Sequence, residues 1–257
     1  LTYSEQGGWS KPPDGTLDSP NTLVVVFGAA AMMDSPQCIQ RLCETFPSAR
    51  IVGCSTSGEI FGDKIYDGSL VVGVARFEKS TLRLASSSIT TGDSHAAGQR
   101  LAHALNEPGL RGLLVLSDGL QVNGSELIRG INSVLPPSVV VTGGLAGDGD
   151  RFQRTWVLED RAFTSGVVTA VWFYGEALRI GHGSQGGWDA FGVERTVTRS
   201  KANVLYELDG KPALQLYKEY LGERASGLPA TGLLFPLALR DPANAEIAGI
   251  FNDAMSS

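Results

Sequence analysis

The chain lacks the features that mark several common classes of protein. Its 257 residues contain no apolar run of about eighteen, the length that a membrane-spanning helix requires. Charged residues make up only 19% of the chain and the net charge is −6, which does not suit a broad electrostatic grip on a phosphate backbone. The composition therefore predicts neither a membrane protein nor a nucleic-acid-binding protein.

Cysteine and histidine are also scarce. The three cysteines are an odd number, and Cys38 and Cys43 sit in a helical apolar pattern, so no disulfide framework is expected. The sequence has no HExxH or CxxC motif, and His95 and His103 are too far apart on one helix to hold a single ion. A dinucleotide fingerprint and a Walker loop are missing too. We therefore predict neither a zinc site nor a nucleotide-binding loop.

Residues 1–21 are polar and rich in glycine, proline and serine. They include neither a basic leader nor an apolar signal core. We expect them to form a segment that precedes the first domain, and we expect the protein to be cytoplasmic.

What the chain does contain is one block twice. Residues 23–59 match residues 112–148 at a constant separation of 89 positions. After an apparent insertion of seven residues, the match resumes at a separation of 96, where 69–83 falls on 165–179. A repeat of this length indicates a duplicated supersecondary block, not a solenoid. Two such blocks packed face to face would bring their equivalent loops together and leave a place for a ligand.

Apolar periodicity predicts the elements of each copy. In the first copy, 22–28 and 50–54 are expected to be strands on either side of a helix over 36–46. The strands 69–77 and 81–89 are expected to form a hairpin. A helix over 94–105 then leads to the second copy, which has a helix that begins after Asn123 and expected strands over 112–117, 139–143, 154–158, 166–174 and 177–181.

These elements indicate the α/β class, with duplicated βαβββ units that form mixed sheets flanked by helices. We expect one domain over 22–189, with its repeats at about 22–90 and 111–188. A smaller α+β unit should follow over 190–257, where the pattern changes.

In this smaller unit, 193–199 and 204–208 are expected to pair as strands, and 212–221 to form a helix closed by Gly222. Residues 240–257 show no convincing partner for a strand or helix.

Two equivalent loops are the first candidates for a ligand site. Their small residues leave room for a bound molecule, and each loop ends in a carboxylate, Glu59 or Asp148, that could bind an amino group. The alternative is that both loops only turn the chain. The residues that we predict to contact a ligand are Cys54, Ser55, Thr56, Ser57, Gly58, Glu59, Gly144, Gly147, Asp148, Arg179 and Trp188.

Other polar residues suggest more specific functions. Cys54 begins the first loop and could be the nucleophile of a hydrolase or amidase-like enzyme, with His182 as its base. His182 lies between glycines and is open enough to ligate haem iron, with Trp188 beside it, or it is an exposed loop histidine. Asp118 and Asn123 flank a loop at the carboxyl edge of a strand, where turn and cap roles would explain both.

An ordered series of motifs over residues 22–240 resembles the FIST family. The series is TLVVVFG, IVGCSTSGEIF, DGSLVVGVARF, VVVTGGLAGDG, HGSQGGW, TVTRSKANVLYELDGKPALQLYKEYLG and GLPATGLLFPLAL. The stretch to about residue 200 is similar to the N-terminal domain of that family, and the remainder to the beginning of its C-terminal domain.

The resemblance implies a sensory domain of signal-transduction proteins that binds a small molecule and is not an enzyme. Amino acids are one ligand that it implies. The segment around Gly8, Trp9 and residues 17–20 looks like the branch that binds haem, senses nitric oxide and regulates histidine kinases and cyclic-di-GMP enzymes. Haem, an amino acid and such a signalling partner are therefore expectations drawn from the resemblance.

Overall fold

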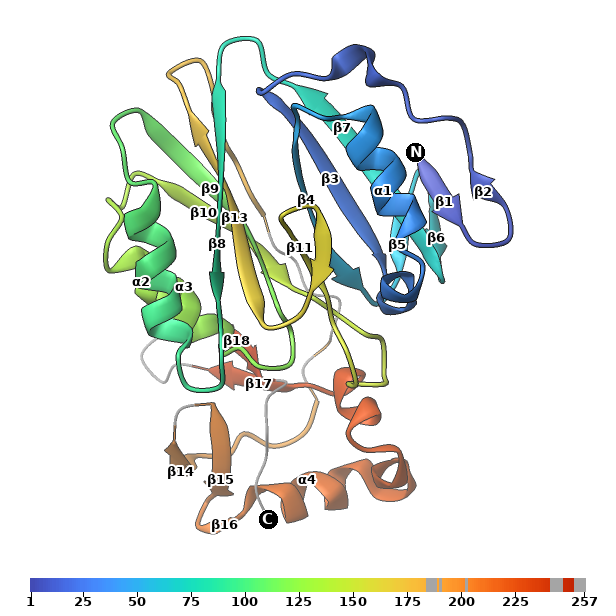
Figure 1. Cartoon of the computed structure of the whole chain (residues 1–257). Helices are drawn as coiled ribbons and strands as arrows, with labels where there is room; N and C mark the ends of the chain where they lie inside the picture. The colour runs from blue at the N-terminus through green and yellow to red at the C-terminus, as the bar shows by residue number, and fades with distance from the viewer. Residues whose placement is uncertain (184–188, 190, 202, 241–246, 252–257) are drawn as a thin grey trace. The chain divides into compact units, whose positions relative to one another are not determined.

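The computed structural model of the chain describes residues 1–183, 189, 191–201, 203–240 and 247–251 (Figure 1). It divides into a first unit, Leu1–Gly183, and a second unit, Ser184–Ser257, each of which is described by itself. None of the helices in the described part of the chain has the length and apolar character to cross a membrane.

The first sheet of the first unit has seven strands, in the order β12-β11-β4-β3-β7-β1-β2. β3 and β4 are parallel and are joined through helix α1 (Gln37–Thr45), whereas the other neighbouring strands are antiparallel. The bounds of the strands are β1 Thr2–Ser4, β2 Gly8–Trp9, β3 Thr22–Ala29, β4 Arg50–Thr56, β7 Ser69–Arg76, β11 Val157–Glu159 and β12 Ala162–Thr164.

The second sheet has four strands, in the order β10-β9-β13-β8. β9 and β10 are parallel and are joined through helix α3 (Gly124–Asn132), as β3 and β4 are joined through α1. Helix α2 (Ser94–Ala104) precedes β9. The strands are β8 Thr81–Ser88, β9 Leu110–Ser117, β10 Val140–Leu145 and β13 Val167–Tyr174.

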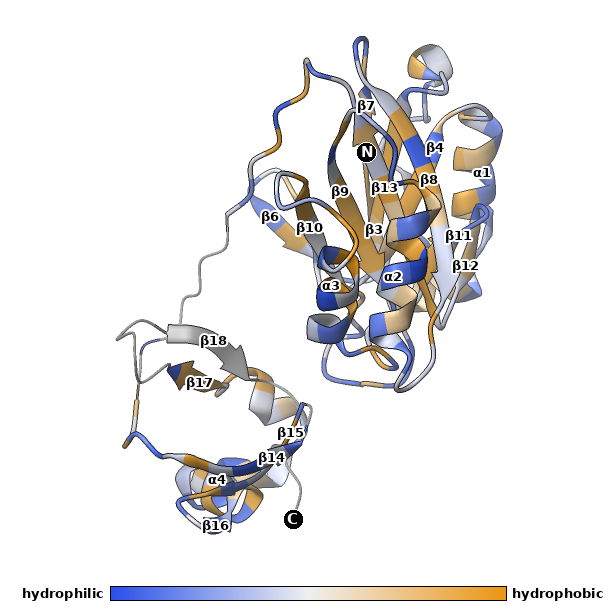
Figure 2. Ribbon diagram, turned by 90° about the vertical axis from the view of Figure 1, so that its left-hand side faces the viewer, coloured by the Kyte–Doolittle hydropathy of each residue, from blue (hydrophilic) through white to orange (hydrophobic). Residues whose placement is uncertain are grey.

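The two sheets pack face to face, and helices cover their outer faces (Figures 1 and 2). Alternate residues of a strand point to opposite faces, so each sheet supplies two cores. Val52, Leu116 and Val171 belong to the core between the sheets. Leu42 of α1 packs on the outer face of the first sheet, and Ile131 of α3 on that of the second. The resulting layers are helix, sheet, sheet and helices, which confirms the α/β class.

The strand registers confirm the duplication and refine it. Val26 pairs with Gly53 across β3 and β4, and Val115 pairs with Gly143 across β9 and β10. A Cβ atom on Gly53 would lie 2.1 Å from the carbonyl oxygen of Val26, and one on Gly143 would lie 1.8 Å from that of Val115. Both copies therefore need glycine at the same close approach of two backbones. These glycines are 90 positions apart, one more than the sequence match predicted.

The third strand of each copy corrects the later part of the match. Val26 pairs with Val72 of β7, and its equivalent Val115 pairs with Ala170 of β13. Equivalent residues of β7 and β13 are thus 98 positions apart, not 96. The hairpin β5–β6 (Glu59–Phe61 and Lys64–Tyr66) and the hairpin β11–β12 have the same separation of 98. The second copy therefore carries an insertion of eight residues between β10 and its hairpin.

The predicted hairpin of 69–77 with 81–89 and the predicted strand over 177–181 are both wrong. β7 and β8 both exist but form no hairpin, because β7 pairs with β3 in the first sheet and β8 pairs with β13 in the second. Residues 177–181 are not a strand. β1 pairs with the edge of β7, and the backbone N–H of Val72 donates to the carbonyl of Leu1, so residues 1–21 contribute to the first sheet.

The second unit contains a three-stranded antiparallel sheet and a helix. β14 (Val197–Lys201), β15 (Val204–Leu208) and β16 (Lys211–Pro212) form the sheet, and α4 (Ala213–Leu221) packs on it through Leu216 and Leu221. The predicted strand pair and helix are confirmed. The prediction that the tail has no partner is wrong, because β17 (Leu237–Arg240) pairs with β18 (Ile247–Phe251). Two 3-10 helices, Gly222–Gly227 and Ala230–Leu233, connect α4 to β17.

Candidate functional site

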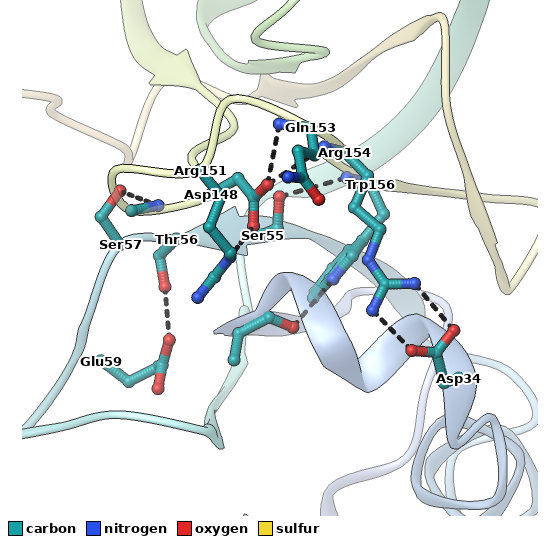
Figure 3. A network of polar contacts seen from close by, with 12 residues as sticks. Asp34, Ser55, Thr56, Ser57, Glu59, Asp148, Arg151, Gln153, Arg154 and Trp156 are labelled. Atoms are coloured by element: carbon teal, nitrogen blue, oxygen red, sulfur yellow. Dashed lines mark hydrogen bonds and ion pairs between the residues drawn. The ribbon is translucent and has the colours of Figure 1, made fainter. Parts of the chain in front are cut away.

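The loops that follow β4 and β10 lie against each other (Figure 3). The backbone N–H of Gly147 donates to the carbonyl of Ser55 at 2.8 Å, and that of Gly149 donates to Oγ of Ser57 at 3.0 Å. A Cβ atom on Gly147 would lie 2.6 Å from Oγ of Ser57. The two copies therefore do meet at these loops, as the duplication predicted. We call this contact the loop junction.

Ser55 also fixes the start of the second hairpin. Its backbone N–H donates to the carbonyl of Trp156 at 2.9 Å, and its Oγ accepts from the N–H of Trp156 at 3.1 Å. The indole Nε1 of Trp156 donates to the carbonyl of Ala29 at 3.1 Å. Both side chains are fully buried, so Ser55 holds β11 against β4 instead of facing solvent.

Glu59 is buried and satisfied within the first copy. Its Oε1 accepts from Oγ1 of Thr56 at 2.8 Å, and its Oε2 accepts from the N–H of Ser69 at 3.2 Å and from Oγ of Ser69 at 2.8 Å. The side chain therefore ties the loop to β7. An amino group that bound Glu59, as the sequence predicted, would have to reach a carboxylate that is only 2% exposed and already accepts three hydrogen bonds.

Asp148 is likewise buried, and it organises the insertion of the second copy. Its carboxylate accepts from the N–H groups of Gln153 and Arg154 at 3.1 and 3.0 Å, and from Nε of Arg151 at 2.9 Å. Burial by itself raises the pKa of Asp148, but these donors outweigh it and hold the pKa below 3.8. Arg154 then reaches back to the first copy through a bidentate pair with Asp34 at 2.8 and 2.5 Å.

Asp118 and Asn123 have the turn and cap roles considered above. The buried carboxylate of Asp118 accepts from the N–H groups of Leu120 and Gln121 at 2.8 and 2.9 Å, and from Oγ1 of Thr155 at 3.0 Å. Oδ1 of Asn123 accepts from the N–H of Glu126 at 3.1 Å and caps α3.

Cys54 lies inside the sheet, not at the start of a loop. It is a residue of β4, is 3% exposed, and belongs to the core between the two sheets with Val52 and Val157. Burial raises the pKa of its thiol to about 12. A nucleophile must be an accessible thiolate, so this position does not suit the hydrolase alternative.

Two predicted contact residues, Arg179 and Trp188, and the candidate haem ligand His182 lie outside the loop junction or outside the described residues. Arg179 and His182 are exposed, and no hydrogen bond or ion pair in the described part of the chain joins either of them to the loops. Trp188 lies outside the described residues. The glycines on either side of His182 are exposed as well, so the immediate neighbours of this residue supply no apolar wall for a porphyrin.

The junction exposes two of the predicted contact residues and one residue that was not predicted. Ser57 and Gly144 are exposed, and the side chain of Arg151 is 56% exposed although its Nε is bonded to Asp148. No repeat-based signal indicates Arg151, because it lies in the insertion that the first copy lacks. Over the described residues, no group of three or more His, Cys, Asp and Glu side chains is placed to hold a metal ion.

A sequence model of the FIST N domain matches residues 22–211, about three quarters of the chain. The chain belongs to the FIST N domain family. This is a family of sensory domains of signalling proteins, and the FIST N domain of this chain includes the loop junction and the sheets of both copies. A search of curated proteins gave no match to the chain.

Proposed function

We propose that this FIST N domain is a non-enzymatic sensor that binds a small ligand at the loop junction. The observation that carries the proposal is the pair of hydrogen bonds from Gly147 and Gly149 to Ser55 and Ser57. Through them, a molecule that contacts either loop acts on both copies. The junction also lies at the carboxyl ends of the parallel strands, the edge where open α/β sheets hold ligands.

The exposed groups favour a ligand that carries a carboxylate. Glu59 and Asp148 are buried and bonded, so they shape the loops, whereas Ser57 and the guanidinium of Arg151 face solvent. Guanidinium binds carboxylates through two parallel hydrogen bonds. A free amino acid, held by its carboxylate at Arg151, is the ligand that we infer, with Ser57 beside it.

A bound ligand signals only if it binds one of two conformations more tightly than the other. Ser55 joins β4 to β11 beside the junction, so a ligand that displaces the loops would change how these two strands hold together. We propose that this change reaches a histidine kinase or a cyclic-di-GMP enzyme in the cytoplasm. The choice of these partners rests on the family resemblance.

A thermal-shift screen of free amino acids tests the proposal. A ligand at about 100 times its Kd should raise the Tm by roughly 5–10 °C. Arg151→Ala should abolish the shift. Arg41→Ala is the matched control, because Arg41 is 55% exposed and bonds an acid three residues away, as Arg151 does. Equal loss of the shift in both variants, or no shift with any amino acid, contradicts the proposal.

Haem with nitric oxide is the second ligand that we propose, from the resemblance, with His182 as the iron ligand. The accessible imidazole of His182 supports it, and the exposed glycines beside it weigh against it. Titration with haem should give a Soret band that His182→Ala removes and His103→Ala preserves. A band that survives His182→Ala assigns the ligand elsewhere, and a colourless protein rejects haem.

A further inference from the structure

The two equivalent hairpins of the first unit have different surroundings. β11–β12 lies on the edge of β4, where Val157 pairs with Cys54, and completes the first sheet. β5–β6 forms a separate two-stranded sheet. In the described part of the chain, no strand pairs with β5 on the side away from β6, and none pairs with β10 on the side away from β9. The first unit therefore has two unpaired strand edges, one on β5 and one on β10. The equivalent edges, on β11 and β4, pair with each other.

The side chains of the two hairpins show the same contrast. Leu158 is fully buried and Phe163 packs on the core beneath α1. Their equivalents, 98 positions earlier, are Ile60 and Ile65, which are 70% and 73% exposed. Phe61 and Tyr66 of the same hairpin are exposed too. Exposed apolar side chains that gather in one patch often mark an interaction surface.

In the second sheet, the residues that an equivalent hairpin would cover are exposed. Ile39 of α1 is 2% exposed, whereas its equivalent on α3, Ile128, is 36% exposed. Leu145, at the end of β10, is 48% exposed. β10 contains no charged residue and no proline, the usual devices that keep a free edge from pairing. This edge of β10, together with Ile128, is called the open edge below.

We propose that the β5–β6 hairpin of one copy of the chain docks on the open edge of a second copy. The dimer contact would repeat, between chains, the contact that the chain already makes between its own copies at β4 and β11. By the equivalences of 90 and 98 positions, Glu59 of one chain would pair with Gly144 of the other, as Val157 pairs with Cys54. Ile60 and Ile65 would then cover Ile128.

A second copy fits better than the hairpin of the same chain. β5 is tied to its own first sheet, because Glu59 accepts two hydrogen bonds from Ser69 of β7. Each chain carries one hairpin and one open edge, so in a twofold dimer each copy would donate its hairpin to the open edge of the other.

Sedimentation velocity over a range of concentrations tests the proposal on the full chain. The wild type should be a dimer, and Ile65→Lys and Gly144→Glu should each weaken the dimer by about tenfold or more. Both substitutions suit the monomer, since Ile65 is exposed and a Cβ atom on Gly144 meets no atom within 4 Å. Leu234→Lys is the control, at a residue that is 69% exposed in the second unit. It should leave the dimer unchanged.

Mixing the two variants identifies the contact. Ile65→Lys keeps an intact open edge and Gly144→Glu keeps an intact hairpin, so the mixture restores one of the two contacts and should form more dimer than either variant alone. A wild type that stays monomeric at its highest soluble concentration overturns the proposal. A dimer that both variants leave intact, or a mixture with no gain, overturns it as well. None of these outcomes depends on a small ligand, so the sensor proposal stands or falls separately.

Discussion

The hairpins β5–β6 and β11–β12 descend from the same part of the duplicated block, yet one is part of a core and the other is not. The turn of β11–β12 carries Arg161, whose guanidinium donates to the carbonyls of Phe46 and Pro47 at 3.1 and 2.8 Å and to that of Ala49 at 3.0 Å. The equivalent residue of β5–β6 is Asp63, a carboxylate that cannot donate to carbonyls. One side chain at a turn therefore separates a hairpin that is fastened to a helix end from one that lacks this fastening.

The residue before each hairpin adds to the difference. Trp156 is fully buried, and its ring lies 4.6 Å from that of Phe163. At the equivalent place the first copy has Gly58, whose missing Cβ would lie 3.2 Å from Ile65. The position before the hairpin thus carries an aromatic side chain that packs on Phe163 in one copy, and no side chain in the other. Divergence after duplication therefore changed the side chains that anchor each hairpin.

Removing the aromatic anchor should have the largest effect on this difference. Trp156→Ala should lower the free energy of unfolding by about 3–5 kcal/mol, because it leaves a cavity and an unpartnered carbonyl on Ala29. Chemical denaturation followed by circular dichroism measures the loss. Trp9→Ala, at a half-buried residue of the edge strand β2, serves as the control and should cost less. Equal losses would show that the docked hairpin is not a main support of the core.

Removing the fastening at the turn should have a smaller effect. Arg161→Ala should cost about 2–3 kcal/mol, and it should also speed the alkylation of Cys43, whose thiol donates to the carbonyl of Arg161 at 3.8 Å. Cys54 in the same protein is an internal control, since it is 3% exposed and should stay unmodified.

The matched change in the other hairpin is Asp63→Ala, which should alter stability by less than about 0.5 kcal/mol. If Arg161→Ala behaves like Asp63→Ala, the bonds to the helix end do not fasten the hairpin. If Cys54 becomes alkylated together with Cys43, the sheets have separated and the change is not local to the hairpin.

The insertion that leads to β11–β12 should make the second copy sensitive to acid. The pKa of Asp148 in the folded protein lies below 3.8, so its contribution to stability is fully present above pH 3.8 and is lost as the pH falls through the folded value. Asp148→Asn should lower the Tm at neutral pH. In acid, the difference in Tm between the variant and the wild type should become smaller. A difference that stays constant with pH would mean that Asp148 acts through shape and not through charge.

Truncating the exposed hairpin should have the smallest effect. Ile65→Ala should change the stability of the dilute chain by less than about 0.5 kcal/mol, because Ile65 is 73% exposed. Phe163→Ala, at the equivalent position, should cost several times more. Denaturation midpoints of the two variants, measured side by side, check this contrast. A large loss with Ile65→Ala under dilute conditions would show that the first hairpin already packs within its own chain.

Much of this fold could be predicted from the sequence, because the decisive signals are local. Buried strands, amphipathic helices and the Asn123 cap follow from neighbouring residues. The separation of 96 instead of 98 positions for the later strands has a physical cause: side chains of a strand alternate with a period of two, so a shift by two residues preserves the inward and outward pattern. Only the pairing of β7 with β3, and of β13 with β9, distinguishes a separation of 96 from one of 98.

The sheet to which a strand belongs could not be predicted in the same way. β7 and β8 follow each other closely, and a hairpin is the local expectation, but β8 is held by Val171 and other residues of β13 that lie far along the chain. Cys54 illustrates the same limit for the candidate site. Its small neighbours suggested a loop, whereas the pairing of β4 with β3 and β11 buries it between two sheets.

The placement of β8 has a consequence for how the protein can be divided. The chain leaves the first sheet after β7, supplies β8 to the second sheet, and later returns β11–β12 to the first. The halves are therefore interleaved, and a cut near Gly92 between β8 and α2 would give two fragments that each lack a strand of their own sheet. Such fragments should stay unfolded when they are made separately, and should regain the native circular dichroism spectrum when they are made together. Each half would then no longer be an autonomous folding unit.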